Sequence, residues 1–136
     1  MIIPNELIPV FKNKDFILAG SRALKAQNML GREETHDYDV ILDYKYFDLV
    51  KDKYTENTMY RRDFPIIICE EKGLKTDIFF RKDYDFLLYF EKENIKILWW
   101  QEVLKEKLIL IDSYKNEPEK KQKHINDVNF ILSKIV

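Results

Sequence analysis

Apolar positions fall in two patterns along this chain, short compact runs and longer segments with a helical period. Short apolar runs bounded by polar or turn residues are typical of buried strands. They predict strands at 15–19, 37–43, 64–69, 74–80 and 95–98, and residues 70–73 have the character of a hairpin loop. The segment 54–63 is ambiguous and could hold another short edge strand.

Helical spacing of apolar residues predicts the remaining elements. We expect helices at 5–12, 21–30, 44–53, 83–91, 99–114 and 118–135. Gly31 would end the second helix, and the polar segment 32–36 would follow it as a loop. Pro118 suits the first turn of the last helix, because a helix leaves that N–H unpaired in any case.

The order of these elements predicts an α/β (α+β) fold. Strands and helices mix in the first part of the chain, and the end is entirely helical. We expect one domain over residues 1–136, with a small mixed β-sheet in a core at about 14–82 and a helical C-terminal cover at about 99–136. A chain of 136 residues has the usual length of a single domain.

Composition narrows the class of protein. Lys and Arg total 23 against 24 Asp and Glu, so the formal net charge is −1, which argues against a chain that coats nucleic acid. A local basic patch remains compatible with this charge. One cysteine, Cys69, cannot form an internal disulfide, and with two histidines it leaves too few ligands for a typical zinc site. We find no signal peptide and no apolar run near the ~18 residues of a membrane span, so we expect a cytoplasmic protein without membrane contact.

A glycine turn follows the first predicted strand. Leu18 and Ala19 end the strand, and Gly20 and Ser21 lead into a helix. Exposed N–H groups at a helix start bind phosphate, and glycine lets a phosphate approach the backbone closely. Ser21 would add a hydroxyl donor, and Arg22 could reach a phosphate from the first turn. The same residues also fit an ordinary capped turn followed by a solvated arginine, so this motif alone does not distinguish a phosphate site from a simple helix start.

Two aspartates begin the second predicted strand. Asp37 and Asp39 are two residues apart, so on a strand they share a face at ~6.6 Å. Two carboxylates beside an apolar run repel each other and are costly to desolvate. Divalent cations resolve the conflict, and Mg²⁺ prefers few carboxylates together with substrate phosphates. A second such pair, Asp83 and Asp85, begins a predicted helix, where acidic residues interact well with the helix dipole.

A third acidic position lies on a later strand. Asp77 precedes the apolar residues 78–80, after a hairpin at Gly73. If this strand lies beside 37–43, Asp77 completes a cluster of three carboxylates that could hold a metal and accept the proton of an attacking hydroxyl. Without the other two motifs, an ordinary aspartate at the end of a strand is the favoured interpretation of Asp77.

Together the motifs resemble the polymerase-β-like nucleotidyltransferase superfamily. That pattern has an apolar strand, Gly-Ser, a helix, Asp-x-Asp and a later acid, matched here by Gly20-Ser21, Asp37-x-Asp39 and Asp77 over about 16–80. The Ala-Leu after the turn and Thr35 before Asp37 are similar to the abortive-infection and toxin–antitoxin branches of minimal nucleotidyltransferases. The C-terminal stretch with His124 and Asp127 is similar to their closing helix.

The resemblance implies Mg²⁺-dependent transfer of a nucleoside monophosphate from a nucleoside triphosphate (NTP) such as ATP, with release of pyrophosphate. Gly20, Ser21 and Arg22 would contact the nucleotide, and Asp37, Asp39 and Asp77 would bind Mg²⁺ or Mn²⁺. Asp77 would also assist the nucleophile. The acceptor stays open between a protein, a tRNA or other RNA end, and a small molecule, and so does the presence of a homo-oligomer or a protein partner.

Two other interpretations compete with an active enzyme. One is a catalytically silent nucleotidyltransferase fold, such as one half of a toxin–antitoxin pair, because a fold does not fix a function. The other is an unrelated α/β protein with structural aspartates, which would show Asp77 pointing away from Asp39. A composition rich in lysine, isoleucine and tyrosine is compatible with an AT-rich bacterial or phage genome.

Overall fold

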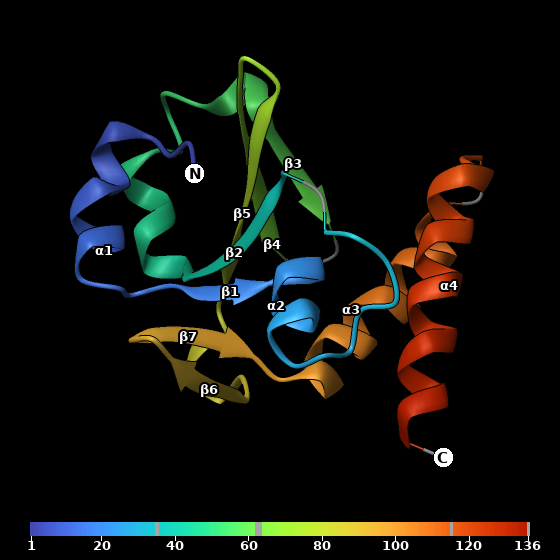
Figure 1. Ribbon diagram of the computed structural model, residues 1–136. Helices are drawn as coiled ribbons and strands as arrows, with labels where there is room; N and C mark the ends of the chain where they lie inside the picture. The colour runs from blue at the N-terminus through green and yellow to red at the C-terminus, as the bar shows by residue number, and fades with distance from the viewer. Residues whose placement is uncertain (35, 62–63, 115, 136) are drawn as a thin grey trace.

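A mixed β-sheet crosses the whole molecule (Figure 1). The structure, a computed structural model, describes residues 1–34, 36–61, 64–114 and 116–135. Within this part of the chain the sheet has seven strands in the order β3-β4-β5-β2-β1-β7-β6. The strands are β1 (Ile17–Ala19), β2 (Tyr38–Asp43), β3 (Thr58–Arg61), β4 (Phe64–Glu71), β5 (Leu74–Arg81), β6 (Tyr89–Lys92) and β7 (Ile95–Leu98).

The centre of the sheet joins segments that are distant in sequence. Strand β2 pairs antiparallel with β1 on one side and parallel with β5 on the other. Strand β1 also pairs parallel with β7. The hairpins β3–β4, β4–β5 and β6–β7 are antiparallel. The predicted α+β fold with a small mixed sheet is therefore confirmed.

Helices cover both faces of the sheet. They are α1 (Ile8–Lys12), α2 (Gly20–Ala26), α3 (Trp100–Ser113) and α4 (Pro118–Ile135), with short 3-10 helices at Asn5–Leu7, Tyr44–Leu49, Thr55–Asn57 and Tyr84–Phe86. In Figure 1, α1 lies on one side of the central strands, while α2, α3 and α4 lie on the other. Helix α4 packs on α3 at the outside, as expected of a C-terminal cover. None of the described helices combines the length and apolar character needed to cross a bilayer.

The alternation of side chains along β2 divides the core in two. Val40 and Leu42 belong to the cluster on the α1 side, whereas Ile41 belongs to the cluster with α2 and α3. Successive strand residues point to opposite faces, so Asp39 shares the face of Ile41. On β5, Asp77 shares its face with Phe79, which also packs against the α2 and α3 cluster. Both carboxylates are thus directed to the helical C-terminal side.

Three predicted elements differ from the structure. The helix predicted at 83–91 is wrong, since a 3-10 turn at Tyr84–Phe86 leads into strand β6, which pairs with β7. The helix predicted at 21–30 ends at Ala26, so Gly31 does not terminate it. A Cβ at Gly31 would come within 2.5 Å of the Phe130 ring, which explains why a glycine suits this place against α4. The helix predicted at 44–53 is a shorter 3-10 helix, Tyr44–Leu49.

Candidate active site

Gly20 forms a tight turn between β1 and α2. Its φ of +61° lies in the left-handed region, which side chains with a Cβ rarely adopt. A Cβ at this position would also collide with the Asp39 carboxylate, because Ala19 pairs with Asp39 across the two strands. Glycine is therefore required twice, for the turn and for the close approach of β2.

Parallel pairing places Asp39 directly beside Asp77. The register between β2 and β5 aligns Tyr38 with Thr76 and Asp39 with Asp77. Asp37 lies immediately before β2, two residues from Asp39. The structure thus brings the three predicted aspartates to one end of two neighbouring strands, and Asp77 does not point away from Asp39.

Mutual repulsion and burial shape the charge of these carboxylates. Burial, and next the negative charge of Asp77, raise the pKa of Asp39 to about 6. Burial likewise raises the pKa of Asp77, against the opposing effect of Lys75. The raised pKa values show that these two carboxylates are buried with too little positive charge beside them, and a bound cation would stabilise their ionised form.

Lys75 forms an ion pair with Asp77. Its Nζ lies 3.6 Å from Asp77 Oδ2, on the same face of β5. The other oxygen, Asp77 Oδ1, is buried without a hydrogen-bond partner in the described structure. An unpaired buried carboxylate oxygen beside Asp39 fits a divalent ion, since Mg²⁺ takes one or two carboxylates and completes its shell with substrate and water. Within the described residues, no group of three or more His, Cys, Asp and Glu side chains forms a ready-made metal cage.

Arg22 braces the start of β2. Its Nε donates to the Asp37 carbonyl oxygen at 3.0 Å, and its guanidinium lies 3.7 Å above the Tyr38 ring. Glu34 Oε1 is 3.9 Å away. These contacts hold the Asp37 backbone in place, so nucleotide binding by Arg22 stays a prediction. Ser21 is partly buried in the first turn of α2.

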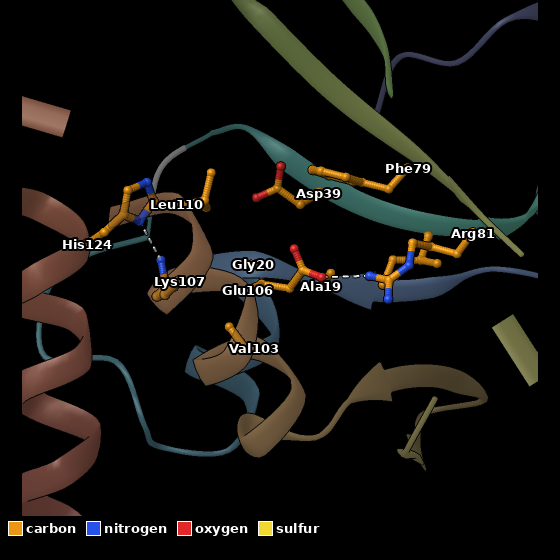
Figure 2. Close-up of a pocket in the computed structure, with 11 residues that line it drawn as sticks. Ala19, Gly20, Asp39, Phe79, Arg81, Val103, Glu106, Lys107, Leu110 and His124 are labelled. Carbon is orange, nitrogen blue, oxygen red and sulfur yellow. Dashed lines mark hydrogen bonds and ion pairs between the residues drawn. The ribbon is translucent and has the colours of Figure 1, made fainter. Parts of the chain in front are cut away.

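A pocket opens beside Asp39, between the sheet and the C-terminal helices (Figure 2), and neither Asp37 nor Asp77 is among its lining residues. Its apolar walls come from Ile41 and Phe79 of the sheet and from Val103 and Leu110 of α3. The remaining lining residues are Ala19, Gly20, Asp39, Arg81, Glu106, Lys107 and His124. Figure 2 shows Asp39 on the β2 side of the pocket, with Lys107 and His124 on the side formed by α3 and α4. Such an apolar cleft with a few convergent polar groups is typical of a small-molecule site.

Buried charges join α4 to this pocket. Asp127 is 3% exposed and accepts two hydrogen bonds of 2.9 Å from Arg32. Lys107, 5% exposed, lies 2.8 Å from Asp127 Oδ2 and 3.2 Å from His124 Nδ1. Burial alone would raise the pKa of Asp127, but the hydrogen bonds from Arg32 and Lys107 outweigh it and hold the pKa below its usual value.

The sequence analysis gave no role at the site to the residues that α3 and α4 contribute. Arg81 pairs with Glu106 at 2.6 Å and with Asp83 at 2.7 Å, and so steadies one edge of the pocket. A signal for Lys107 was available, because it falls four residues after Val103 and three before Leu110, on the apolar face of its helix. A charged residue in an apolar stripe needs a buried partner. Nothing in the sequence showed that Asp127 is that partner.

Comparison with solved structures finds proteins of similar fold. The chain is similar in structure to the antibiotic-resistance factor ANT(2'')-Ia, with a TM-score of 0.61 and 10% sequence identity over 96% of this chain and 81% of that one. A candidate nucleotidyltransferase from Thermotoga maritima, TM1012, gives a TM-score of 0.47 and 17% identity over 89% of this chain and 94% of that one. No protein-family profile matches the chain, and no curated protein matches its sequence. At 10% sequence identity, the similarity to ANT(2'')-Ia shows a shared fold alone.

Proposed function

We propose that the protein is a metal-dependent nucleotidyltransferase that moves a nucleoside monophosphate from an NTP to a hydroxyl acceptor. The observation that carries this proposal is the pairing of Asp39 with Asp77, where Asp39 lies against the Gly20 turn and lines a pocket. Phosphoryl transfer depends on positioning and charge neutralisation; these residues would position the phosphate and hold the metal that neutralises its charge. The similarity of the fold to ANT(2'')-Ia agrees with this reading.

Each residue has a defined task in this reaction. Asp39 and Asp77, with Asp37 at the strand start, would hold Mg²⁺ or Mn²⁺, which supplies charge neutralisation at the transferred phosphate. The Gly20–Ser21 turn offers backbone that a phosphate can approach without meeting a Cβ. Arg22 keeps Asp37 in position through its carbonyl.

The chemical step is an in-line displacement. The acceptor oxygen forms a bond to the α-phosphorus, and the bond from that phosphorus to the pyrophosphate oxygen breaks. Pyrophosphate leaves with the bonding electrons, and the proton of the acceptor hydroxyl passes to the Asp77 carboxylate. Asp77 suits this task because its register opposite Asp39 places it next to the proposed metal and acceptor positions.

The pocket bears on the acceptor. Its walls are mainly apolar and it is enclosed by α3 and α4, so it suits a small molecule or a single side chain better than an RNA end. The minimal branch of the superfamily, a cytoplasmic location and a partner or second subunit that completes the acceptor site belong to the same proposal.

A transfer assay tests the function. The protein is incubated with each α-labelled NTP, Mg²⁺ or Mn²⁺, and panels of protein, tRNA and small hydroxyl compounds, and labelled products and pyrophosphate are measured. We expect one NTP to give both products in equal amounts, and the Asp39→Asn variant to lose at least about 100-fold in rate. Asp85→Asn, in the exposed second Asp-x-Asp, is the matched control and should keep the wild-type rate. Equal rates for wild type and Asp39→Asn would contradict the proposal.

A further inference from the structure

Lys107 has an unusual position for a lysine. Its side chain is only 6% exposed, and it lines the same pocket as Asp39 and Gly20. An ammonium group has three N–H donors. Two of them have acceptors, Asp127 Oδ2 at 2.8 Å and His124 Nδ1 at 3.2 Å. In the part of the chain that the structure describes, no further acceptor takes the third donor, which leaves it for a ligand in the pocket.

His124 offers a second donor at the same wall. Lysine has no acceptor atom, so it donates to Nδ1, and the neutral imidazole then carries its proton on Nε2. Burial, together with the Lys107 cation, lowers the pKa of His124 to about 4, which keeps the ring in this neutral form. The ring is stacked on Tyr114, with 5.6 Å between centroids and 9° between planes, so its orientation is fixed.

The Lys107 side chain is held firmly in its position beside the pocket. Asp127 is not among the lining residues; it lies 2.8 Å from Lys107 and is itself held by two hydrogen bonds from Arg32. These contacts hold the Lys107 ammonium group in one position, so the cation is preorganised for a ligand. Glu106 also lines the pocket, but its Oε1 is paired with Arg81 at 2.6 Å, which reduces its repulsion of an anion.

We propose that Lys107 and His124 form an anion subsite that holds a phosphate group, opposite Gly20 and Asp39. This inference rests on the proposed function for the identity of its ligand, which is the polyphosphate of an NTP or the pyrophosphate released from it. A phosphate in this pocket would lie between the Asp39 side and the donors of α3 and α4. The C-terminal helices thereby become part of the nucleotide site instead of a mere cover.

Calorimetric titration with pyrophosphate in EDTA, at pH 7.5, tests the subsite without any metal. We expect wild type to bind pyrophosphate, and Lys107→Met to weaken binding by at least about tenfold, the usual scale for loss of a charged hydrogen bond. His124→Phe keeps a ring for stacking on Tyr114 but removes the N–H, and should weaken binding several-fold. Asp39→Asn should strengthen binding, because it removes a negative charge from the pocket.

The matched control is Lys105→Met, on the same helix. Lys105 is exposed and pairs with Glu102, so its loss should leave pyrophosphate binding unchanged. In Lys107→Met, Asp127 keeps both hydrogen bonds from Arg32, and circular dichroism checks that the fold persists. The subsite is refuted if Lys107→Met and His124→Phe bind as wild type does, if Lys105→Met loses as much, or if wild type binds no pyrophosphate with or without Mg²⁺.

A parallel titration with NTP and Mg²⁺ separates this inference from the proposed function. Tight NTP binding that is insensitive to Lys107→Met would overturn the subsite and leave the nucleotidyltransferase proposal standing. Pyrophosphate binding that depends on Lys107, in a protein that transfers no nucleotide, would support the anion subsite and contradict the proposed nucleotidyltransferase activity.

Discussion

Single residues show how closely the turn and the strand of this site are fitted together. Gly20 adopts a φ of +61° and lies against the Asp39 carboxylate, so the phosphate turn and the acidic strand depend on one another. A short motif such as Gly-Ser is weak in a sequence because many turns contain it. The contact between Gly20 and Asp39 gives the motif its meaning, and only the structure shows it.

Gly20→Ala should therefore destabilise the fold as well as the site. We expect a loss of about 2–4 kcal/mol, from left-handed backbone strain and from displacement of the Asp39 side chain. Gly73→Ala is the matched control, since Gly73 has a φ of +80° but nothing within 4 Å of the added Cβ. It should lose only the strain, about 1 kcal/mol. Urea unfolding measures both variants, and equal losses would show that the Asp39 contact is unimportant.

The pH dependence of stability reports the state of Asp39. Its pKa of about 6, against 3.8 for an ordinary aspartate, means that the folded protein binds this proton more tightly than the unfolded chain. The resulting stabilisation is complete below about pH 4 and is lost as the pH rises through about 6. Asp39→Asn cannot undergo this loss, so its stability relative to wild type should increase over that range.

The expected gain for Asp39→Asn is at most about 3 kcal/mol, since one pKa unit corresponds to about 1.4 kcal/mol. Free energies of unfolding of the two proteins in EDTA, at pH 4.5 and pH 8, measure it. His124 titrates in both proteins and cancels in the difference. A difference that is the same at both pH values would contradict the raised pKa of Asp39.

Among the elements, α4 has more than a covering role. The sequence predicted this helix with the bounds that the structure gives, Pro118–Ile135, because its apolar positions recur with a clear helical period. The same pattern could not show that Asp127 reaches Lys107 of α3 and Arg32 of the segment before β2. Contacts between distant segments follow from tertiary packing, which periodicity does not encode.

Asp127→Asn should destabilise the protein by about 3–5 kcal/mol, because it leaves the buried Lys107 cation without its partner. Arg32→Met should cost less, since Asp127 then still pairs with Lys107 and the Arg32 side chain is 26% exposed. Glu117→Gln, which removes an exposed pair with Lys120, should change stability by less than about 1 kcal/mol. Thermal and urea unfolding rank the three variants. An Asp127→Asn protein as stable as Glu117→Gln would show that the Asp127 network does not contribute to the free energy of unfolding.

The segment 83–91 shows where local patterns mislead. Residues Tyr89–Lys92 become strand β6 because they pair with β7, through a turn in which Glu93 and Asn94 both have positive φ. Asparagine adopts positive φ more readily than most residues, so Asn94 was a signal for this turn. The apolar residues before it also fit a helical period, and they favoured the wrong prediction. Pairing with a strand that lies later in the chain decided the outcome.

In the whole molecule, the order of strands in the sheet and the packing of α3 and α4 bring together segments that are distant in sequence. The pocket is lined by residues of the β1–α2 turn, β2, β5, α3 and α4. The sequence predicted the α+β class and the individual acidic motifs, since each rests on local apolar runs. The parallel register of Asp39 with Asp77 and the pocket wall from α3 and α4 needed the folded chain. The predicted site was therefore one half of the pocket, the acidic and glycine half, and the cationic half was missing from it.

The central claim is that this pocket binds a nucleotide through a metal held by the aspartates. Calorimetric titration of wild type with each NTP, with Mg²⁺ and with EDTA, compared with Asp37→Ala and Asp39→Asn, tests it most directly. The predicted result is that at least one NTP binds much more tightly with Mg²⁺ than with EDTA, and that both variants lose this gain. Absence of NTP binding in wild type, or binding that the variants and EDTA leave unchanged, would contradict the claim.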